Sequence, residues 1–151
     1  MSKVAADGKK KLRALSSLRR KILLVDDDPV DLQFYGLILE HEGYQVTVSG
    51  SFEGAVQVLD QESFDMVVVG QGGPRFKGRS VVNRARQVDP QRPVAVIARH
   101  PDPGSYIEAM NLGAVDYREK TADAAEFVSV IEAYLGLAPP ASWKGVTSTA
   151  R

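Results

Sequence analysis

Three consecutive carboxylates follow the first strongly apolar stretch of the chain. Residues 21–31 read KILLVDDDPVD, so four apolar residues run directly into Asp26, Asp27 and Asp28, and Pro29 follows. Such an apolar run is typical of a strand buried on both faces, and proline is favoured in the first turn of a helix. We therefore expect the acids at the carboxyl end of a strand, where open α/β sheets bind ligands. Two carboxylates about 5 Å apart repel by roughly 3 kcal/mol at an effective dielectric of about 20, so Mg²⁺, a lysine or water must offset the charge.

Composition limits the chemistry that the chain can perform. The 151 residues include no cysteine and two histidines. This excludes disulfides, zinc–thiolate sites and thiol nucleophiles, and it disfavours a histidine metal cluster. The apolar run at 22–25 is too short for a signal peptide or a membrane span, so we expect a soluble, cytoplasmic protein with no membrane association.

Charge and composition divide the chain into three parts. Residues 1–20 carry seven Lys/Arg and one acid, whereas residues 21–151 carry twelve Lys/Arg and eighteen acids. We interpret 1–20 as a basic leader that is partly disordered or forms a short helix. Residues 21–136 are expected to form one folded domain. Residues 137–151 contain two prolines and no apolar period, which predicts a disordered tail whose one aromatic residue is Trp143.

Strand-like and helix-like segments alternate along residues 21–136. Apolar or alternating runs predict strands at 21–25, 44–48, 65–69, 94–98 and 114–118. Helical periodicity and capping residues predict helices at 29–42, from Ser51 onward, and at about 79–88, 105–112 and 123–135. This alternation predicts an α/β fold with right-handed βαβ units, in which helices cover both faces of a five-stranded parallel sheet.

The order of four motifs resembles the receiver domain of response regulators. The motifs are LLVDDDP, FDMVVV with a following loop that contains Pro and Gly, PVAVIA and GAVDYREK. The resemblance covers residues 21–136 and implies a CheY-like, doubly wound fold with strand order 2-1-3-4-5. In that family an acidic pair holds Mg²⁺, and an aspartate ending strand three accepts a phosphoryl group from a histidine kinase. A Ser/Thr ending strand four, an aromatic residue and a lysine respond to that group. Asp26 and Asp27 match the acidic pair, Tyr117 the aromatic residue and Lys120 the lysine.

The chain departs from the family pattern at the reacting positions. A gapless alignment of FDMVVVGQGGPRFKG puts Gly70 at the phosphoacceptor position, and Ala98 stands at the Ser/Thr position. Glycine can neither attack phosphorus nor ligate a metal, and alanine has no hydroxyl. We therefore predict a pseudo-receiver with no catalytic residue and no cofactor beyond weak Mg²⁺ binding at Asp26 and Asp27. Lys120 is expected to pair with one of these two acids.

The predicted function is a phosphorylation-independent signalling module of a two-component or phosphorelay system, which acts by protein–protein interaction and is not an enzyme. Its partner would be a histidine kinase or another signalling protein, with a homodimer as a further option. In the family, helix four, strand five and helix five form a common interaction face, where Tyr106, Met110, Tyr117 and Phe127 lie in this chain. Because Ala98 offers no hydroxyl, Tyr117 is expected to keep one rotamer.

Two alternatives remain open on the sequence. The first is a phosphoryl-accepting receiver that uses Mg²⁺ and a substitute aspartate, Asp28 or Asp102. The second is nucleic-acid binding through the basic leader and a segment with seven cations against one acid, although no reading helix is recognisable. The cations are Arg75, Lys77, Arg79, Arg84, Arg86, Arg92 and Arg99. The loop 70–73 is glycine-rich but lacks the known phosphate-binding patterns, so we expect a flexible turn.

Overall fold

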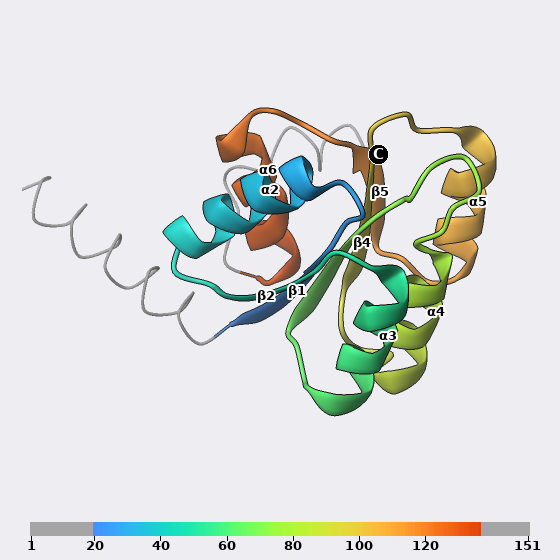
Figure 1. The fold of residues 1–151 in the computed structure, drawn as a ribbon, viewed down its shortest axis with the longest axis horizontal. Helices are drawn as coiled ribbons and strands as arrows, with labels where there is room; N and C mark the ends of the chain where they lie inside the picture. The colour runs from blue at the N-terminus through green and yellow to red at the C-terminus, as the bar shows by residue number, and fades with distance from the viewer. Residues whose placement is uncertain (1–19, 137–151) are drawn as a thin grey trace, which may run out of the picture.

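Five strands alternate with five helices in the computed structural model, which describes residues 20–136 (Figure 1). The elements are β1 (Lys21–Val25), α2 (Pro29–His41), β2 (Gln45–Ser49), α3 (Phe52–Gln61), β3 (Met66–Gly70), α4 (Arg79–Val88), β4 (Val94–Ala98), α5 (Pro103–Asn111), β5 (Asp116–Glu119) and α6 (Ala124–Tyr134). The predictions for residues 1–19 and for the tail with Trp143 lie outside the described residues. No helix within 20–136 is long and apolar enough to cross a membrane.

The strands form one parallel sheet in the order β2-β1-β3-β4-β5. This confirms the predicted fold class and strand order. The chain moves outward from β1 to β2 and then returns past β1 to β3. A crevice therefore forms beyond the carboxyl ends of β1 and β3, where the connections leave in opposite directions.

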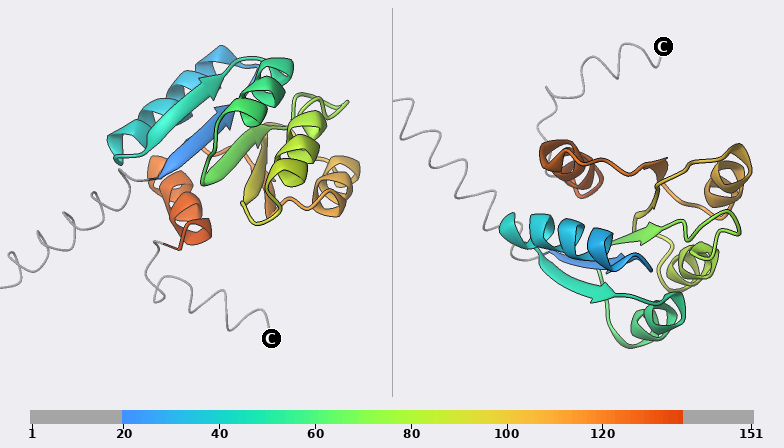
Figure 2. Two further views of the ribbon diagram at one scale, coloured as in Figure 1. Left: turned by 90° about the horizontal axis from the view of Figure 1, so that it is seen from below. Right: turned by 45° about the horizontal axis from the view of Figure 1, so that its top comes forward.

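Side chains of the central strands alternate between two apolar layers. Helices α2 and α6 cover one face of the sheet, and α3, α4 and α5 cover the other (Figure 2). Ile22 and Leu24 of β1 pack with residues of α2 and α6, whereas Leu23 and Val25 pack with residues of α3, α4 and α5. Every residue of β3 and β4 is buried. Burial on both faces explains why these strands have continuous apolar runs rather than alternating ones.

Two element boundaries near the crevice differ from the prediction. Helix α5 begins at Pro103 rather than at Ser105, because Asp102 caps it by accepting a hydrogen bond from the Ser105 N–H. Strand β3 continues one residue further than expected, so Gly70 is its last residue and pairs with Ile97 of β4. Gly70 is consequently held in the sheet, and the loop begins at the next residue.

Candidate functional site

The three acids that follow β1 have three different surroundings. Asp26 is buried, with 2% of its surface exposed, and its Oδ1 accepts a hydrogen bond of 3.0 Å from the Asp28 N–H. Asp27 is exposed. Asp28 caps α2, since its Oδ1 accepts hydrogen bonds from the N–H groups of Val30 and Asp31 at 2.9 and 3.3 Å. The triplet therefore does not act as one cluster of equivalent carboxylates.

Asp26 occupies the space beside Gly70. A Cβ atom built on Gly70 would lie 2.9 Å from both Cγ and Oδ2 of Asp26. Carbon–carbon contacts are favourable at about 3.5–4.0 Å, so this distance is a clash. Any side chain at position 70 would thus compete with the buried carboxylate for the same volume.

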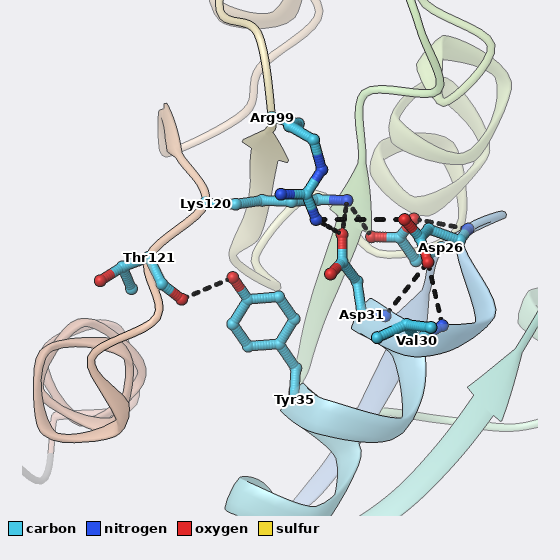
Figure 3. Close-up of polar contacts among 8 residues, drawn as sticks. Asp26, Val30, Asp31, Tyr35, Arg99, Lys120 and Thr121 are labelled. Carbon is cyan, nitrogen blue, oxygen red and sulfur yellow. Dashed lines mark hydrogen bonds and ion pairs between the residues drawn. The ribbon is translucent and has the colours of Figure 1, made fainter.

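Lys120 neutralises this buried acid together with a second one (Figure 3). Its Nζ lies 2.8 Å from Oδ2 of Asp26 and donates a hydrogen bond of 2.7 Å to Oδ2 of Asp31. Arg99, the residue after β4, also donates to Asp31. The predicted pairing of Lys120 is therefore present with Asp26. Asp31 was not predicted as a site residue, although it lies in the first turn of α2, three residues after Asp28.

The network alters the ionisation of its members. Burial alone would raise the pKa of the Asp31 carboxyl, but the hydrogen bonds and charges of Lys120 and Arg99 outweigh burial and hold this pKa below its usual value. Burial alone would lower the pKa of Lys120, whereas hydrogen bonds and charges from Asp26 and Asp31 raise it above its usual value. Both shifts favour the charged forms, so the ion pairs persist across the neutral pH range.

A second polar cluster lies at the other side of the crevice. Gln71, the residue after Gly70, is 4% exposed, and its Oε1 accepts a hydrogen bond from the Tyr117 hydroxyl. Its Nε2 donates to the Gly73 carbonyl at 2.9 Å and to Oδ2 of Asp102 at 3.1 Å. The Tyr117 hydroxyl in turn accepts a hydrogen bond of 3.0 Å from the Asp102 N–H. Sequence reasoning missed Gln71, because its glycine-rich surroundings suggested a flexible turn.

A cavity of about 630 Å³ opens at this edge of the sheet, lined in part by Asp27, Asp28, Gly72, Arg99, Asp102 and Lys120. Among residues 20–136, no three acidic, histidine or cysteine side chains are grouped so that they could hold a metal ion. Asp26 already uses Oδ1 to accept a backbone N–H and Oδ2 to face the Lys120 ammonium. The residues at this edge therefore do not fit the Mg²⁺ site that the family resemblance implies.

Comparison with known proteins decides the family. The model of the response regulator receiver domain matches residues 22–132. This chain belongs to that family. It is similar to the transcriptional regulatory protein GlrR of Escherichia coli (strain K12), with 29% identity over 121 residues, covering 80% of this chain and 27% of GlrR. It is also similar to the transcriptional regulatory protein FixJ of Bradyrhizobium diazoefficiens, with 28% identity over 121 residues, covering 80% of this chain and 59% of FixJ.

This receiver domain spans less than two-thirds of the length of either relative. Among solved structures, it resembles a CheY-like response regulator receiver domain protein from Methanospirillum hungatei JF-1. The TM-score is 0.73 with 23% identity, and the match covers 78% of this chain and 94% of that protein. At this identity the likeness supports the fold alone.

The two aspartates proposed as substitute acceptors both cap helices of the receiver domain. Asp28 caps α2, and Asp102 caps α5 through a hydrogen bond of 2.8 Å from the Ser105 N–H to its Oδ1. The other carboxylate oxygen of Asp102 accepts from Gln71. Both carboxylates line the cavity. Each oxygen of Asp102 accepts a hydrogen bond that it would have to give up to attack, whereas Asp28 accepts its two through Oδ1 and its Oδ2 lies 4.0 Å from Arg99.

Five of the seven cations in the arginine-rich segment have partners within the domain, either acids from other elements or carbonyls of the segment itself. The pairs are Arg79 with Glu108, Arg84 with Asp60, Arg86 with the Pro90 carbonyl, Arg92 with the Ala85 carbonyl, and Arg99 with Asp31. Arg92 is 4% exposed, so it lies in the interior. Arg75 and Lys77 are exposed. Arg79 and Arg99 are exposed as well, but each is paired with an acid, so the exposed cations are a weak basis for the anion-attracting surface that the sequence suggested.

The predicted interaction face is partly accessible. Tyr106 and Met110 of α5 are 48% and 37% exposed, and Ile107 beside them is 56% exposed. Phe127 is an exception: it is 4% exposed, and its ring centroid lies 4.6 Å from that of Tyr35. Assigning Phe127 to the surface was wrong, because this residue fills the core between α2 and α6.

Proposed function

We propose that this receiver domain signals through protein contacts and accepts no phosphoryl group at the usual position. The observation that carries this proposal is the place of Asp26, which fills the volume beside Gly70 while paired with Lys120. Transfer to a carboxylate needs a nucleophilic oxygen in line with the donor and cations on the phosphoryl oxygens. Here the nucleophile is missing and the lysine is already engaged with two acids.

We propose further that the domain acts without Mg²⁺. Ala98, the last residue of β4, offers no hydroxyl to a phosphoryl group, and Asp26 has no oxygen free of a partner. Without metal and phosphoryl group, the domain has no chemical step to perform, so it acts as a binding module and not as an enzyme.

The most accessible apolar part of the α5–β5 face is formed by Tyr106, Ile107, Met110 and Val115, and we assign the protein contact to these residues. Receiver domains bind histidine kinases and other signalling proteins, and many form dimers. For this chain we propose a signalling-protein partner, with a second copy of the chain as the further option. Analytical ultracentrifugation of Met110→Asp tests the second copy. Val30→Asp is the matched control, because Val30 is exposed on α2. If a homodimer survived Met110→Asp but dissociated in Val30→Asp, the assignment of the contact to the α5–β5 face would be wrong.

Intact-mass measurement after treatment with a small phosphodonor and Mg²⁺ tests the main proposal. We expect no covalent phosphoryl adduct, while a receiver domain with an aspartate at the acceptor position, treated in parallel, becomes modified. An acid-resistant, base-labile adduct on this chain would overturn the proposal. Repeating the measurement on Asp28→Asn and Asp102→Asn would then identify a substitute acceptor.

A further inference from the structure

The backbone of Gln71 is held on both sides. Its N–H donates a hydrogen bond of 2.8 Å to the Ile97 carbonyl of β4, and its carbonyl accepts one of 2.9 Å from the Gly78 N–H. Gly78 packs so closely that an added Cβ would lie 2.3 Å from the Gly70 carbonyl oxygen. The start of the Gln71 side chain is therefore fixed relative to the sheet, unlike that of a residue in a flexible turn.

The Gln71 amide connects three separate parts of the domain. It accepts from Tyr117 of β5, donates to the Asp102 carboxylate that caps α5, and donates to the Gly73 carbonyl of its own loop. A buried amide that loses such partners carries a desolvation penalty, so the buried position of Gln71 favours the arrangement in which all three bonds exist.

These bonds reach the surface assigned to the protein contact. The Tyr117 ring contacts the Tyr106 ring edge to face, with 5.7 Å between their centroids. Tyr106 is the half-exposed aromatic residue of α5, which lies beside β5 (Figure 1). The orientation of the Tyr117 ring therefore determines what the exposed Tyr106 ring packs against.

We propose that Gln71 is a positioning residue that holds Tyr117 and the loop 99–102 in one arrangement without a phosphoryl group. This inference rests on the proposed function, because it names what fixes the α5–β5 face in a domain that receives no phosphoryl signal. The amide supplies from the end of β3 the hydrogen-bond partner that Ala98 cannot supply from the end of β4. The Tyr117 ring is held inward by its hydroxyl and is not free to exchange rotamers.

Gln71→Met tests the hydrogen bonds separately from packing, because methionine has a similar length and volume but none of the amide's hydrogen-bonding groups. NMR of tyrosine-labelled protein reads the χ1 angle and the hydroxyl proton of Tyr117, assigned with Tyr117→Phe. We expect one χ1 value and a slowly exchanging hydroxyl proton in the parent chain. Gln71→Met should average χ1 over two rotamers, remove the hydroxyl signal and speed amide exchange in residues 99–102 by about tenfold. Gln33→Met, an equal change on the exposed side of α2, should alter none of these.

A second variant distinguishes the two ends of the amide. Gln71→Glu keeps an acceptor for the Tyr117 hydroxyl but removes the donor to Asp102 and places two carboxylates together. Tyr117 should keep its rotamer in Gln71→Glu, while exchange in residues 99–102 still rises. An unchanged Tyr117 signal and unchanged exchange in Gln71→Met would overturn this inference. Failure of the proposed function would instead show as a phosphoryl adduct on the parent chain, so the two failures are distinguishable.

Discussion

Replacement of Lys120 by methionine tests the idea that the acids are neutralised from within the domain. The lysine side chain is 9% exposed, and it lies between Asp26, which is 2% exposed, and Asp31. Methionine keeps most of the aliphatic length but removes the charge. Asp31 retains Arg99 as a partner, whereas Asp26 keeps only the hydrogen bond from the Asp28 N–H. The variant thus leaves one carboxylate buried without a counter-charge.

Breaking a buried ion pair by removing one partner costs about 3–5 kcal/mol, because the remaining charge stays desolvated. Solvent screening is small for a pair this enclosed, so we expect the free energy of unfolding to fall by an amount in this range. For a folded unit of this size, a change of 1 kcal/mol moves Tm by about 4 °C, so Tm should fall by about 12–20 °C. Urea unfolding at pH 7 and differential scanning calorimetry measure the two quantities.

Two further variants make this measurement decisive. Lys77→Met removes an exposed lysine from the loop before α4 and should leave Tm nearly unchanged. Asp26→Asn combined with Lys120→Met removes the stranded charge, so the double variant should be more stable than Lys120→Met alone. An unchanged Tm in Lys120→Met would refute the reasoning, since water or a metal ion, and not the lysine, would then balance Asp26.

Four other outcomes follow from the same geometry. Gly70→Ala should cost about 1–3 kcal/mol, because its Cβ would meet Asp26 at 2.9 Å; equal stability in thermal unfolding would contradict the clash. Addition of 10 mM Mg²⁺ should raise the free energy of unfolding by less than about 0.4 kcal/mol, which is the stabilisation expected for a Kd of about 10 mM. A larger stabilisation, seen as a larger rise in Tm, would indicate a functional metal site. Tyr35→Phe removes the 2.7 Å hydrogen bond to the Thr121 carbonyl and should cost about 1 kcal/mol in urea unfolding. Because hydrogen bonds hold the pKa of Asp31 below its usual value, its stabilisation exists above the unfolded pKa of about 3.9 and is lost as pH falls through the folded pKa. Asp31→Asn should therefore flatten the acid limb of a stability–pH curve, and an unaltered limb would show that other groups determine it.

The distribution of apolar residues along the sequence predicted the fold well. Strands buried on both faces must be apolar throughout, so β1, β3 and β4 were visible as continuous runs. The strand predicted at 114–118 begins two residues before β5 and ends one residue before it, since the Ala114 N–H still bonds to the Ala109 carbonyl at the end of α5. Local hydrogen bonds of this kind leave no periodic signal in the sequence.

The candidate site was predictable only where a residue type is itself informative. The three adjacent acids could be recognised from their type, and the resemblance to the receiver family led from them to Gly70 and Lys120. Gln71 and Asp31 could not be recognised in this way. A glutamine in a glycine-rich loop and an aspartate in the first turn of a helix are common surface residues, and their importance here comes from tertiary contacts over 46 and 89 positions.

The two buried acids at the crevice are paired with cations of the domain itself. Asp26 and Asp31 carry two negative charges, and Lys120 and Arg99 supply two positive charges in direct contact with them. A divalent cation that approached Asp26 or Asp31 would be repelled by Lys120 and Arg99, although three further acids, Asp27, Asp28 and Asp102, line the same cavity. An aspartate at position 70 would add a further negative charge that could attract a cation, but Asp26 fills the space that this side chain needs. The glycine and the internal lysine pair therefore support each other: the small residue makes room for the buried acid, and the lysine makes that burial tolerable.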